Sequence, residues 1–348
     1  MSNANSITTP IPTRWVGPFT FAKVSTLGKT QEITATEVPL ATLETTLFFS
    51  VQRGSRVIQK TGGVFSTMLS DSMTRSITLQ TQTAQEAEKI GRYVKTNLTR
   101  LQTEVVSKQS RYAQLQTIDV YQVANLVYLR IAIFSDNASG HNMVTLVADA
   151  IGDYLLNEFP TASYVSVSGN MCVDKKVSVI NAIKGRGKHI ITEITIPKAL
   201  VESELKTTPE KIVDLNIKKN LLGSIMAGSV HSANAHYANM LLAIYLATGQ
   251  DAANIVEGSQ GITFAEVRDG NLYFSITIPN IIVGTVGNGK NEEVFRDRLV
   301  KMGCDGPRGS QTLAHLVGAT VLAGELSLLA ALTNPHELMR AHTSIERK

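Results

Sequence analysis

Residues 113–122 (AQLQTIDVYQ) and residues 125–135 (NLVYLRIAIFS) decide the fold, because they are two runs of strand-forming side chains separated by only a few residues. We expect them to pair as antiparallel strands joined by a turn near Val123-Ala124. Upstream, the alternating stretch SITLQ at residues 76–80 predicts another strand of the same unit.

Two predicted helices complete this unit. A polar, periodic helix is expected over residues 83–106, and an amphipathic helix from Asn142 to Phe159, where Pro160 ends it. SYVSVSG, which begins at Ser163, predicts the last strand. The order β-α-β-β-α-β is that of a ferredoxin-like domain, and we place this small domain at residues 79–166.

The flanking residues 1–78 and 167–348 are expected to form one discontinuous large domain. Strands are predicted from HIITEITIP and NLYFSITIPNIIVG, and an Ala/Leu-rich helix over residues 309–333. The stretch from Asn220 to about Val256 predicts a very long, buried helix. The predicted fold class is therefore α+β, with a large domain built around a long central helix and an inserted ferredoxin-like domain.

The composition excludes several classes of protein. The 348 residues include 43% hydrophobic and 18% charged residues, which is typical of a compact globular chain. A net charge of +4 is too small to indicate a nucleic-acid partner, although a basic RNA-binding module remains a weak alternative reading of the small domain. Cys172 and Cys304, the only cysteines, exclude a disulfide framework and a four-cysteine metal site, and we expect no metal.

The sequence predicts neither export nor a membrane partner. The opening MSNANSITTPIPTRW lacks the basic-then-apolar order of a signal peptide. The longest apolar candidate, from Leu221 to Ala247, is interrupted by polar residues such as His231 and Asn239. We therefore expect a cytoplasmic protein.

Four stretches are rich in Gly, Asn, Asp and Lys. The loop at residues 168–176 (SGNMCVDKK) could bind a carboxylate or simply be solvated, and the amides of residues 136–143 could receive a phosphate or a ribose. The turn at residues 284–289 could admit a ligand or be a plain hairpin. Polar residues within the predicted long helix could be caps or structural hydrogen-bonding groups. From these residues alone, each alternative stays open.

Taken together and in order, four long motifs resemble the class I type of hydroxymethylglutaryl-CoA (HMG-CoA) reductase. They are SGNMCVDKKVSVINAIKGRGK, NLLGSIMAGSVHSANAHYANMLLAIYLATGQDAAN, NLYFSITIPNIIVGTVGNG and HELMRAH. Upstream, VPLATLETTL, RGSRVI and LSDSMTRS also resemble family segments, so the similarity runs from about Pro10 to Arg347.

The resemblance implies NADPH-dependent reduction of HMG-CoA to mevalonate and CoA, in the mevalonate pathway of isoprenoid synthesis. It implies HMG-CoA and CoA as ligands, NADPH (NADP) as cofactor, and a homodimer or homotetramer with active sites at subunit interfaces. A relative that only binds a CoA thioester or a dinucleotide is the alternative, because Asn137 stands where the family has an aspartate.

The resemblance also implies roles for individual residues. Lys175 would stabilise the thioester oxygen, Glu44 would supply a proton to the mevaldehyde carbonyl, and His342 would protonate the CoA thiolate. Asp251 would hold Lys175 charged and keep Glu44 protonated. The implied substrate-binding residues are Arg75, Ser168, Lys176, Lys219 and Asn239. The implied cofactor-binding residues are Ser110, Arg111, Asn137, Asn142, Val286 and Gly287.

Overall fold

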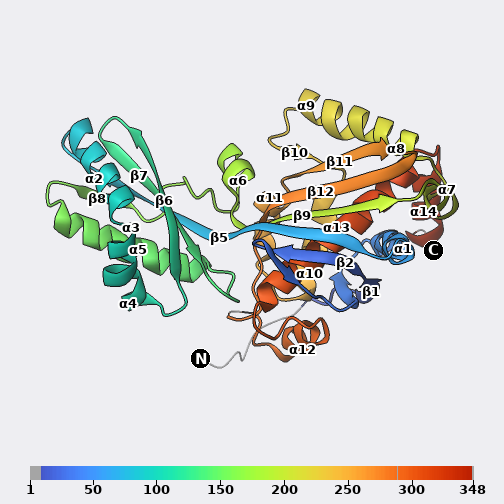
Figure 1. Cartoon of the computed structure of the whole chain (residues 1–348), viewed down its shortest axis with the longest axis horizontal. Coiled ribbons are helices and arrows are strands. Elements are labelled where there is room, and N and C mark those ends of the chain that lie inside the picture. The colour runs from blue at the N-terminus through green and yellow to red at the C-terminus, as the bar shows by residue number, and fades with distance from the viewer. Residues whose placement is uncertain (1–8, 288, 347–348) are drawn as a thin grey trace.

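The computed structural model describes residues 9–287 and 289–346 and has two lobes of mixed α/β structure (Figure 1). Each lobe has its own cluster of buried apolar residues. We call residues 73–167 the small lobe and the remaining described residues the large lobe. The sequence predicts no signal peptide at the N-terminus. Residues 1–8, on which part of that prediction rests, lie outside the described residues.

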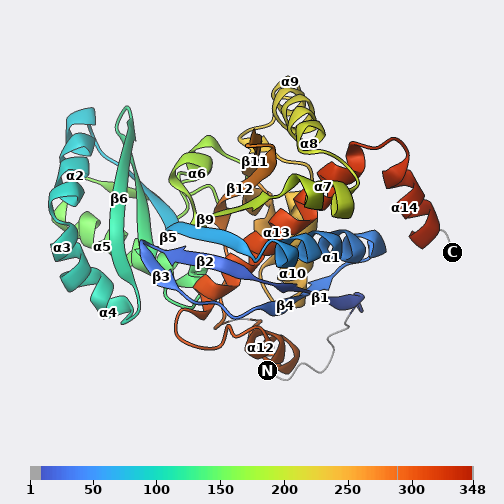
Figure 2. The ribbon, with the colours of Figure 1, turned by 45° about the vertical axis from the view of Figure 1, so that its right-hand side comes forward.

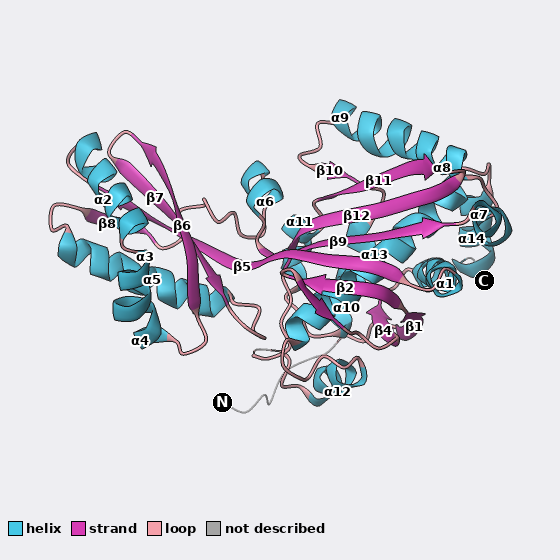
Figure 3. Cartoon of the chain, in the orientation of Figure 1, coloured by secondary structure: helices cyan, strands magenta, loops and turns pink. Residues whose placement is uncertain are grey.

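One strand, β5 (Val64–Gln80), belongs to the sheets of both lobes (Figure 3). Its first part pairs antiparallel with β9 (Gly187–Ile196) in the large lobe, and its last part pairs antiparallel with β7 (Leu126–Phe134) in the small lobe. The strand predicted at residues 76–80 is therefore only the end of a 17-residue strand.

The large-lobe sheet has the order β10-β11-β12-β9-β5-β2-β3. Most neighbours are antiparallel, but β2 runs parallel to β5, and β10 runs parallel to β11. The strands not yet given are β2 (Phe21–Thr26), β3 (Lys29–Gln31), β10 (Ser232–Ala233), β11 (Gly261–Arg268) and β12 (Asn271–Ile281). A separate pair consists of β1 (Thr13–Phe19) and β4 (Thr36–Ala41).

The core of the large lobe is the helix α13 (Gly309–Leu332), which is buried over nearly its whole length. It packs against β9, β12, α1 (Thr45–Lys60) and α10 (Tyr237–Ala247), so it needs no polar face. Its length and composition would suit a membrane span, but 94% of its most apolar window is buried in the protein, as in a core helix. The longest apolar stretch is thus this helix, not the expected Leu221–Ala247.

The very long helix predicted from Asn220 to Val256 is wrong. A π-helical segment, η2 (Asn216–Gly223), and α9 (Ser224–Met226) end at Ala227, and α10 begins only at Tyr237. Gly228 and His231 take positive φ angles of 73° and 48° between them, which a continuing helix does not allow. The Asn234 amide donates to the carbonyls of Ser259 and Gly261. This side chain, which was expected inside a helix, therefore stabilises the non-helical segment between α9 and α10.

After α10 the same stretch breaks again. It continues as the short helices η3 (Ala252–Asn254) and α11 (Ile255–Gly258). Asp251 caps η3, because its side chain accepts a hydrogen bond from the Ala253 N–H. This capping places the Asp251 carboxylate at a helix start on the protein surface.

The small lobe has the predicted hairpin of β6 (Gln114–Val123) and β7, with Ala124 at a positive φ of 52° in the turn. Its last strand, β8 (Ser163–Ser166), pairs with the end of β5. The helix α5 (His141–Glu158) matches its prediction closely. The helix predicted over residues 83–106 is interrupted, and it consists of α2 (Ala84–Thr96), α3 (Leu98–Leu101), η1 (Gln102–Val106) and α4 (Ser107–Gln109).

The remaining helices lie around the large lobe. They are α6 (Val179–Lys184), α7 (Lys198–Leu205), α8 (Pro209–Leu215), α12 (Glu293–Lys301) and α14 (Glu337–Glu346). Helix α14 contacts α1 and α13 and lies at the end of the large lobe that is farthest from the small lobe (Figures 1 and 2).

Candidate active site

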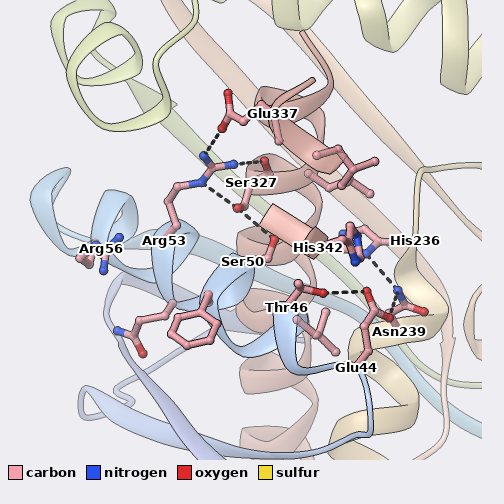
Figure 4. Close-up of a pocket in the computed structure, with 16 residues that line it drawn as sticks. Glu44, Thr46, Ser50, Arg53, Arg56, His236, Asn239, Ser327, Glu337 and His342 are labelled. Carbon is pink, nitrogen blue, oxygen red and sulfur yellow. Dashed lines mark hydrogen bonds and ion pairs between the residues drawn. The ribbon is translucent and has the colours of Figure 1, made fainter. Parts of the chain in front are cut away.

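A cavity of about 490 Å³, which we call the acid cavity, lies where α1, α10, α13 and α14 meet (Figure 4). Glu44, His236, Asn239 and His342 line it, together with two guanidinium groups, Arg53 and Arg56. The acid cavity therefore combines a carboxylate, two imidazoles and two fixed cations.

Glu44 immediately precedes α1, but its side chain does not cap that helix. Instead, its Oε2 accepts a hydrogen bond of 3.2 Å from the Asn239 amide, and its Oε1 accepts one of 3.4 Å from the Thr46 hydroxyl. The carboxylate is thus held by two neutral donors and faces the acid cavity (Figure 4).

His236 continues this chain of hydrogen bonds. Its Nε2 lies 2.9 Å from the Gly324 carbonyl oxygen, which can only accept, so Nε2 carries the proton. Nδ1 is then an acceptor and receives the Asn239 amide at 3.4 Å. The Asn239 amide is consequently fixed between an imidazole and the Glu44 carboxylate.

The buried carboxylate of Glu325 supports this arrangement from behind. It accepts hydrogen bonds from the backbone N–H groups of Ala235 at 2.6 Å and His236 at 3.1 Å, and from the Thr263 hydroxyl at 2.9 Å. Because it receives several donors, this α13 carboxylate fixes the start of α10 and hence the side chains of His236 and Asn239.

His342 reaches the acid cavity because α14 is anchored to α1. Arg53 forms an ion pair of 2.8 Å with Glu337 at the start of α14, and it also donates to the hydroxyl and carbonyl oxygens of Ser327. Both charged side chains are about four-fifths buried, so this pair is better protected from water than a surface ion pair. One guanidinium therefore ties together α1, α13 and α14.

A second pair of predicted residues, Lys175 and Asp251, forms an ion pair of 2.8 Å. The hydrogen bond to Asp251 raises the pKa of Lys175 above its usual value, although burial opposes this. Burial is the largest influence and works to raise the pKa of Asp251. The hydrogen bonds from Lys175 and the Ala253 N–H, together with the charge of Lys175, outweigh it, so that pKa is lowered. Each group thus holds the other in its charged form.

Asp251 also lines a second cavity, of about 540 Å³, between the two lobes. We call it the inter-lobe cavity. Residues 138–143 form one wall, and Val286, Gly287 and Lys290 form another. Lys290 is 7% exposed, and burial lowers its pKa. Burial and the charge of Arg186 lower the pKa of His141 to about 4, so this imidazole is neutral at pH 7.

The two walls of the inter-lobe cavity touch closely. A Cβ on Gly284 would lie 2.3 Å from the Ser139 amide nitrogen, so only glycine fits there. Ala138 bridges to Val286, and the Thr285 N–H donates to the Asn137 carbonyl oxygen at 2.8 Å. Residues 284–287 are consequently a close backbone contact between the lobes, which a plain hairpin turn would not require. Asn288 lies outside the described residues.

The side chain of Asn137, predicted to bind the cofactor, is used elsewhere. Its Oδ1 accepts from the Ser310 N–H, and its Nδ2 donates to the Gly306 carbonyl oxygen, both at 3.1 Å. It is not among the residues that line the inter-lobe cavity, and its contact with the cofactor stays a prediction. The predicted Asn142, Val286 and Gly287 do line that cavity.

Other predicted residues line neither cavity. Ser110 accepts from the N–H groups of Tyr112 and Ala113, and the Arg111 guanidinium stacks on the Tyr112 ring at 4.7 Å. Ser168 is exposed. Lys176 donates to the Asp174 carbonyl oxygen at 3.2 Å, and Lys219 to the Asn220 side chain at 3.4 Å. Arg75 donates to the Thr145 hydroxyl at 2.9 Å and lies 3.5 Å from Asp174.

The predicted network of Lys175, Asp251 and Glu44 is not present within one chain. Among the described residues, no hydrogen bond or ion pair joins Asp251 to Glu44, whose carboxylate contacts Asn239 and Thr46 instead. The reason is geometric, since Glu44 lines the acid cavity and Asp251 the inter-lobe cavity.

The sequence motifs gave no role to Arg53, Arg56, His236, His141 and Lys290. The spacing of Arg53 and Arg56 places both on one face of a helix, which was a usable signal. His236 lies three residues before Asn239, but it was taken only as an interruption of an apolar helix. His141 and Lys290 gave no signal, because only the fold shows that their side chains are largely buried.

Comparison with known proteins identifies the family. The family model described as hydroxymethylglutaryl-coenzyme A reductase matches residues 8–347. The chain belongs to the hydroxymethylglutaryl-coenzyme A reductase family. It is 45% identical over 316 residues to 3-hydroxy-3-methylglutaryl-coenzyme A reductase of Pyrococcus horikoshii, covering 89% of this chain and 76% of that protein. It is also 45% identical to the reductase of Methanothermobacter thermautotrophicus, and that match covers 89% of this chain and 77% of that protein.

Family membership makes the chain an oxidoreductase, and solved structures of reductases share its fold. A 3-hydroxy-3-methylglutaryl-coenzyme A reductase of Streptococcus pneumoniae superposes with a TM-score of 0.73 at 17% identity, covering 96% of this chain and 87% of that chain. A class II reductase from the same organism, bound to NADPH in open conformations, superposes with a TM-score of 0.71 at 16% identity, covering 96% and 88%. At these identities the likeness concerns the fold alone.

Proposed function

We propose that this reductase catalyses the NADPH-dependent, two-step reduction of HMG-CoA to mevalonate and CoA in the mevalonate pathway, in the cytoplasm. The observation that carries the proposal is the Lys175–Asp251 ion pair, because it presents a charged ammonium beside a cavity with room for a dinucleotide. An ammonium in such a position stabilises the negative charge that develops on a carbonyl oxygen during hydride addition.

The residues of the inter-lobe cavity fit a dinucleotide. Gly287 exposes its backbone to the cavity, residues 138–143 include the start of α5, and Lys290 supplies a buried cation. We assign Asn142, Val286, Gly287 and Lys290 to holding NADPH, which would supply the hydride for each of the two reductions. Ser110 and Arg111 are proposed to contact its phosphates from the surface of the small lobe.

The acid cavity is suited to the CoA ester. Arg53 and Arg56 present guanidinium groups that match phosphate and carboxylate oxygens. We propose that His342 protonates the departing CoA thiolate, and that Glu44 donates a proton to the mevaldehyde carbonyl. Asn239, which holds Glu44, and Arg75, Ser168, Lys176 and Lys219 are proposed to bind the HMG group.

We propose that the enzyme is a homodimer or homotetramer in which a second copy brings Lys175 to Glu44. Two observations support this. Glu44 lines the acid cavity, whereas Asp251, the ion-pair partner of Lys175, lines the inter-lobe cavity. In addition, a row of apolar side chains is exposed on η2 and α9. These side chains are Ile217, Leu222, Ile225 and Met226, which are 44%, 54%, 72% and 87% exposed. Exposed apolar patches of this kind mark protein interfaces.

The finer classification is also part of the proposal. We assign the chain to the class I reductases, since it is 45% identical to archaeal reductases and only 16% identical to the reductase described as class II. We propose that residues 79–166 form a ferredoxin-like NADP-binding domain, with residues 1–78 and 167–348 as the large domain. In this division α13 is the central helix of the large domain.

The test is NADPH consumption, followed by its ultraviolet absorbance, when purified protein is mixed with HMG-CoA. We expect two NADPH to be oxidised per HMG-CoA, and Lys175→Ala to lose at least about a hundredfold in kcat, because it removes a charge aimed at the oxyanion. The matched control is Lys198→Ala, because Lys198 is an exposed lysine on α7 that pairs with Glu202. A second exposed lysine, Lys218, pairs with Asp214 but lies within η2, beside the proposed interface. Tight CoA-ester binding without oxidation of NADPH or NADH would instead identify a non-catalytic binding protein.

A further inference from the structure

Arg186 is a completely buried arginine that lies between Gly185 and Gly187, immediately before β9. Its NH1 donates a hydrogen bond of 2.9 Å to Glu257 Oε1, and its NH2 lies 3.0 Å from Asp174 Oδ1. Glu257 is likewise completely buried. Buried ion pairs of this kind are costly to desolvate and are seldom retained for stability alone. The role of this arginine therefore lies in the residues that its two partners, Glu257 and Asp174, keep in place.

Both partners act on the same peptide unit. Asp174 is the residue directly before Lys175, and Glu257 Oε1 also accepts the backbone N–H of Lys175 at 3.1 Å. Arg186 consequently holds this peptide from both sides, through the side chain of one residue and the amide of the next. The Asn254 side chain donates to the same Glu257 oxygen at 3.0 Å and fixes it further.

The loop that carries Lys175 has an unfavourable backbone. Asn170, Val173 and Lys175 all adopt positive φ angles, of 60°, 43° and 54°. Such angles cost about 1–3 kcal/mol each for residues other than glycine, and Val173 is β-branched, which makes its angle less favourable still. A loop of this kind persists only when its surroundings over-determine it.

The surroundings of the loop supply such restraints one by one. The Ser76 hydroxyl accepts the Met171 N–H at 3.0 Å, and the Asn181 amide donates to the Val173 carbonyl oxygen at 2.8 Å. The backbone of Asp174 and Lys175, the residue that carries the ammonium, is held in place by Arg186 and Glu257. Lysine could not replace Arg186 there, because a single ammonium cannot reproduce the two-pronged reach of a guanidinium.

We propose that Arg186 is the positioning residue that fixes the Lys175 ammonium against Asp251. By bridging Asp174 and Glu257, it locks the peptide that aims the Lys175 side chain. Its kinetic consequence rests on the proposed function, whereas its structural consequence, the Lys175–Asp251 pairing, does not. Arg186 does not itself face either cavity, so it acts only through Lys175.

The first test measures the pairing of Lys175 with Asp251 and does not require catalytic turnover. The rate of acylation of each lysine by a succinimidyl ester is measured by mass spectrometry, with Lys218 as internal reference. In the native protein Lys175 reacts slowly, because Asp251 keeps its ammonium protonated. Arg186→Lys keeps the charge but loses the bridge, and we expect the Lys175-to-Lys218 rate ratio to rise at least about fivefold, as it should in Asp251→Asn.

The matched control is another buried ion pair close to Arg186 in the sequence, Lys188 on β9 with Asp71 on β5, at 3.2 Å. Asp71→Asn breaks that pair and should lower the thermal midpoint at least as much as Arg186→Lys, yet leave the Lys175 ratio unchanged. An equal rise of the ratio in Asp71→Asn would mean that general loosening explains the effect and would overturn the proposal. Glu257→Gln, which removes one partner's charge and little volume, provides a second test should Arg186→Lys not fold.

The kinetic test separates the two proposals. We expect Arg186→Lys to lower kcat roughly 10- to 100-fold with little change in KM for HMG-CoA, because misaligning a catalytic group affects the transition state most. A wild-type protein without turnover would refute the proposed function, while the acylation ratio would still decide on Arg186. An unchanged ratio in both Arg186→Lys and Glu257→Gln overturns the positioning role, whatever the turnover.

Discussion

At the scale of single residues, the Lys175–Asp251 pair sets a pH range for the enzyme. Each side chain is 43% exposed, so water screens the attraction and the pair contributes little to stability. Its effect is on protonation instead. The raised pKa of Lys175 keeps the ammonium charged to higher pH, and the lowered pKa of Asp251 keeps the carboxylate charged to lower pH. The pair is thus intact throughout the neutral range.

Asp251→Asn should shift the alkaline limb of the kcat profile to lower pH. The hydrogen bond that raises the pKa of Lys175 is weakened in this variant, so the ammonium loses its proton earlier as the pH rises. The measurement is kcat against pH from neutral upward, for the variant and the wild type. An alkaline limb that stays in place would show that Lys175 is not the group that titrates.

The sequence identified these site residues but not their arrangement. Glu44 and Asn239 are 195 residues apart, and their motifs gave no sign that their side chains would bond. Asp251 and Lys175 were expected together and are together. Arg186 and Glu257 could not have been singled out, because an arginine in a glycine-rich stretch is usually solvated, and only the fold reveals that both are buried.

At the scale of elements, α1 and α13 approach each other unusually closely. A Cβ on Gly54 would lie 2.1 Å from the Ala323 carbonyl oxygen, so the two helix backbones are in contact there. Arg53 is the neighbouring residue, and it anchors both α13 and α14. The glycine therefore sets the helix spacing at which the acid cavity is built.

Gly54→Ala should destabilise the protein by roughly 1–3 kcal/mol, because the added methyl group must push two helices apart. Gly152→Ala is the control, since Gly152 also lies in a helix but its Cβ would meet only the Ile77 side chain, at 3.7 Å. That change should be neutral or stabilise by up to about 1 kcal/mol through helix propensity. Urea unfolding of both variants measures this, and equal losses would contradict the close contact.

Elements with a strong local signal were predicted well, and those fixed by long-range contacts were not. The hairpin of β6 and β7 and the helix α5 follow from alternation and periodicity. The break between α9 and α10 depends on Asn234 bonding to residues about 25 positions away, which no local pattern contains. The full length of β5 was missed for the same reason, because its first half is defined by β9 and β2.

At the scale of the whole molecule, the proposed catalytic groups lie apart in one chain. Glu44 and His342 line the acid cavity, whereas Asp251 lines the inter-lobe cavity and pairs with Lys175. If each complete site takes Glu44 and His342 from one copy and Lys175 and Asp251 from another, two inactive variants should complement each other. Mixing Glu44→Gln with Lys175→Ala, followed by subunit exchange, should restore about a quarter of wild-type activity for a symmetric dimer.

The control for this experiment is a mixture of Glu44→Gln with His342→Gln. Both residues line the acid cavity of the same chain, so every mixed site would keep a defect and activity should stay absent. No complementation in the first mixture would show that the site is built within one chain. Complementation in the control mixture would show that Glu44 and His342 of one site come from different chains, which would contradict the proposed division.

The continuity of β5 limits how the two lobes can move. A single hydrogen-bonded ribbon passes from one sheet into the other, and residues 284–287 lock onto residues 137–139 on the far side of the junction. The two lobes are therefore connected by a continuous, hydrogen-bonded strand. The described residues of β5 contain no flexible hinge. Twisting one lobe would turn Arg75, near the middle of β5, against Asp174 in the loop of Lys175. A ligand that fills the inter-lobe cavity and turns the lobes would therefore also move the loop that carries the Lys175 ammonium.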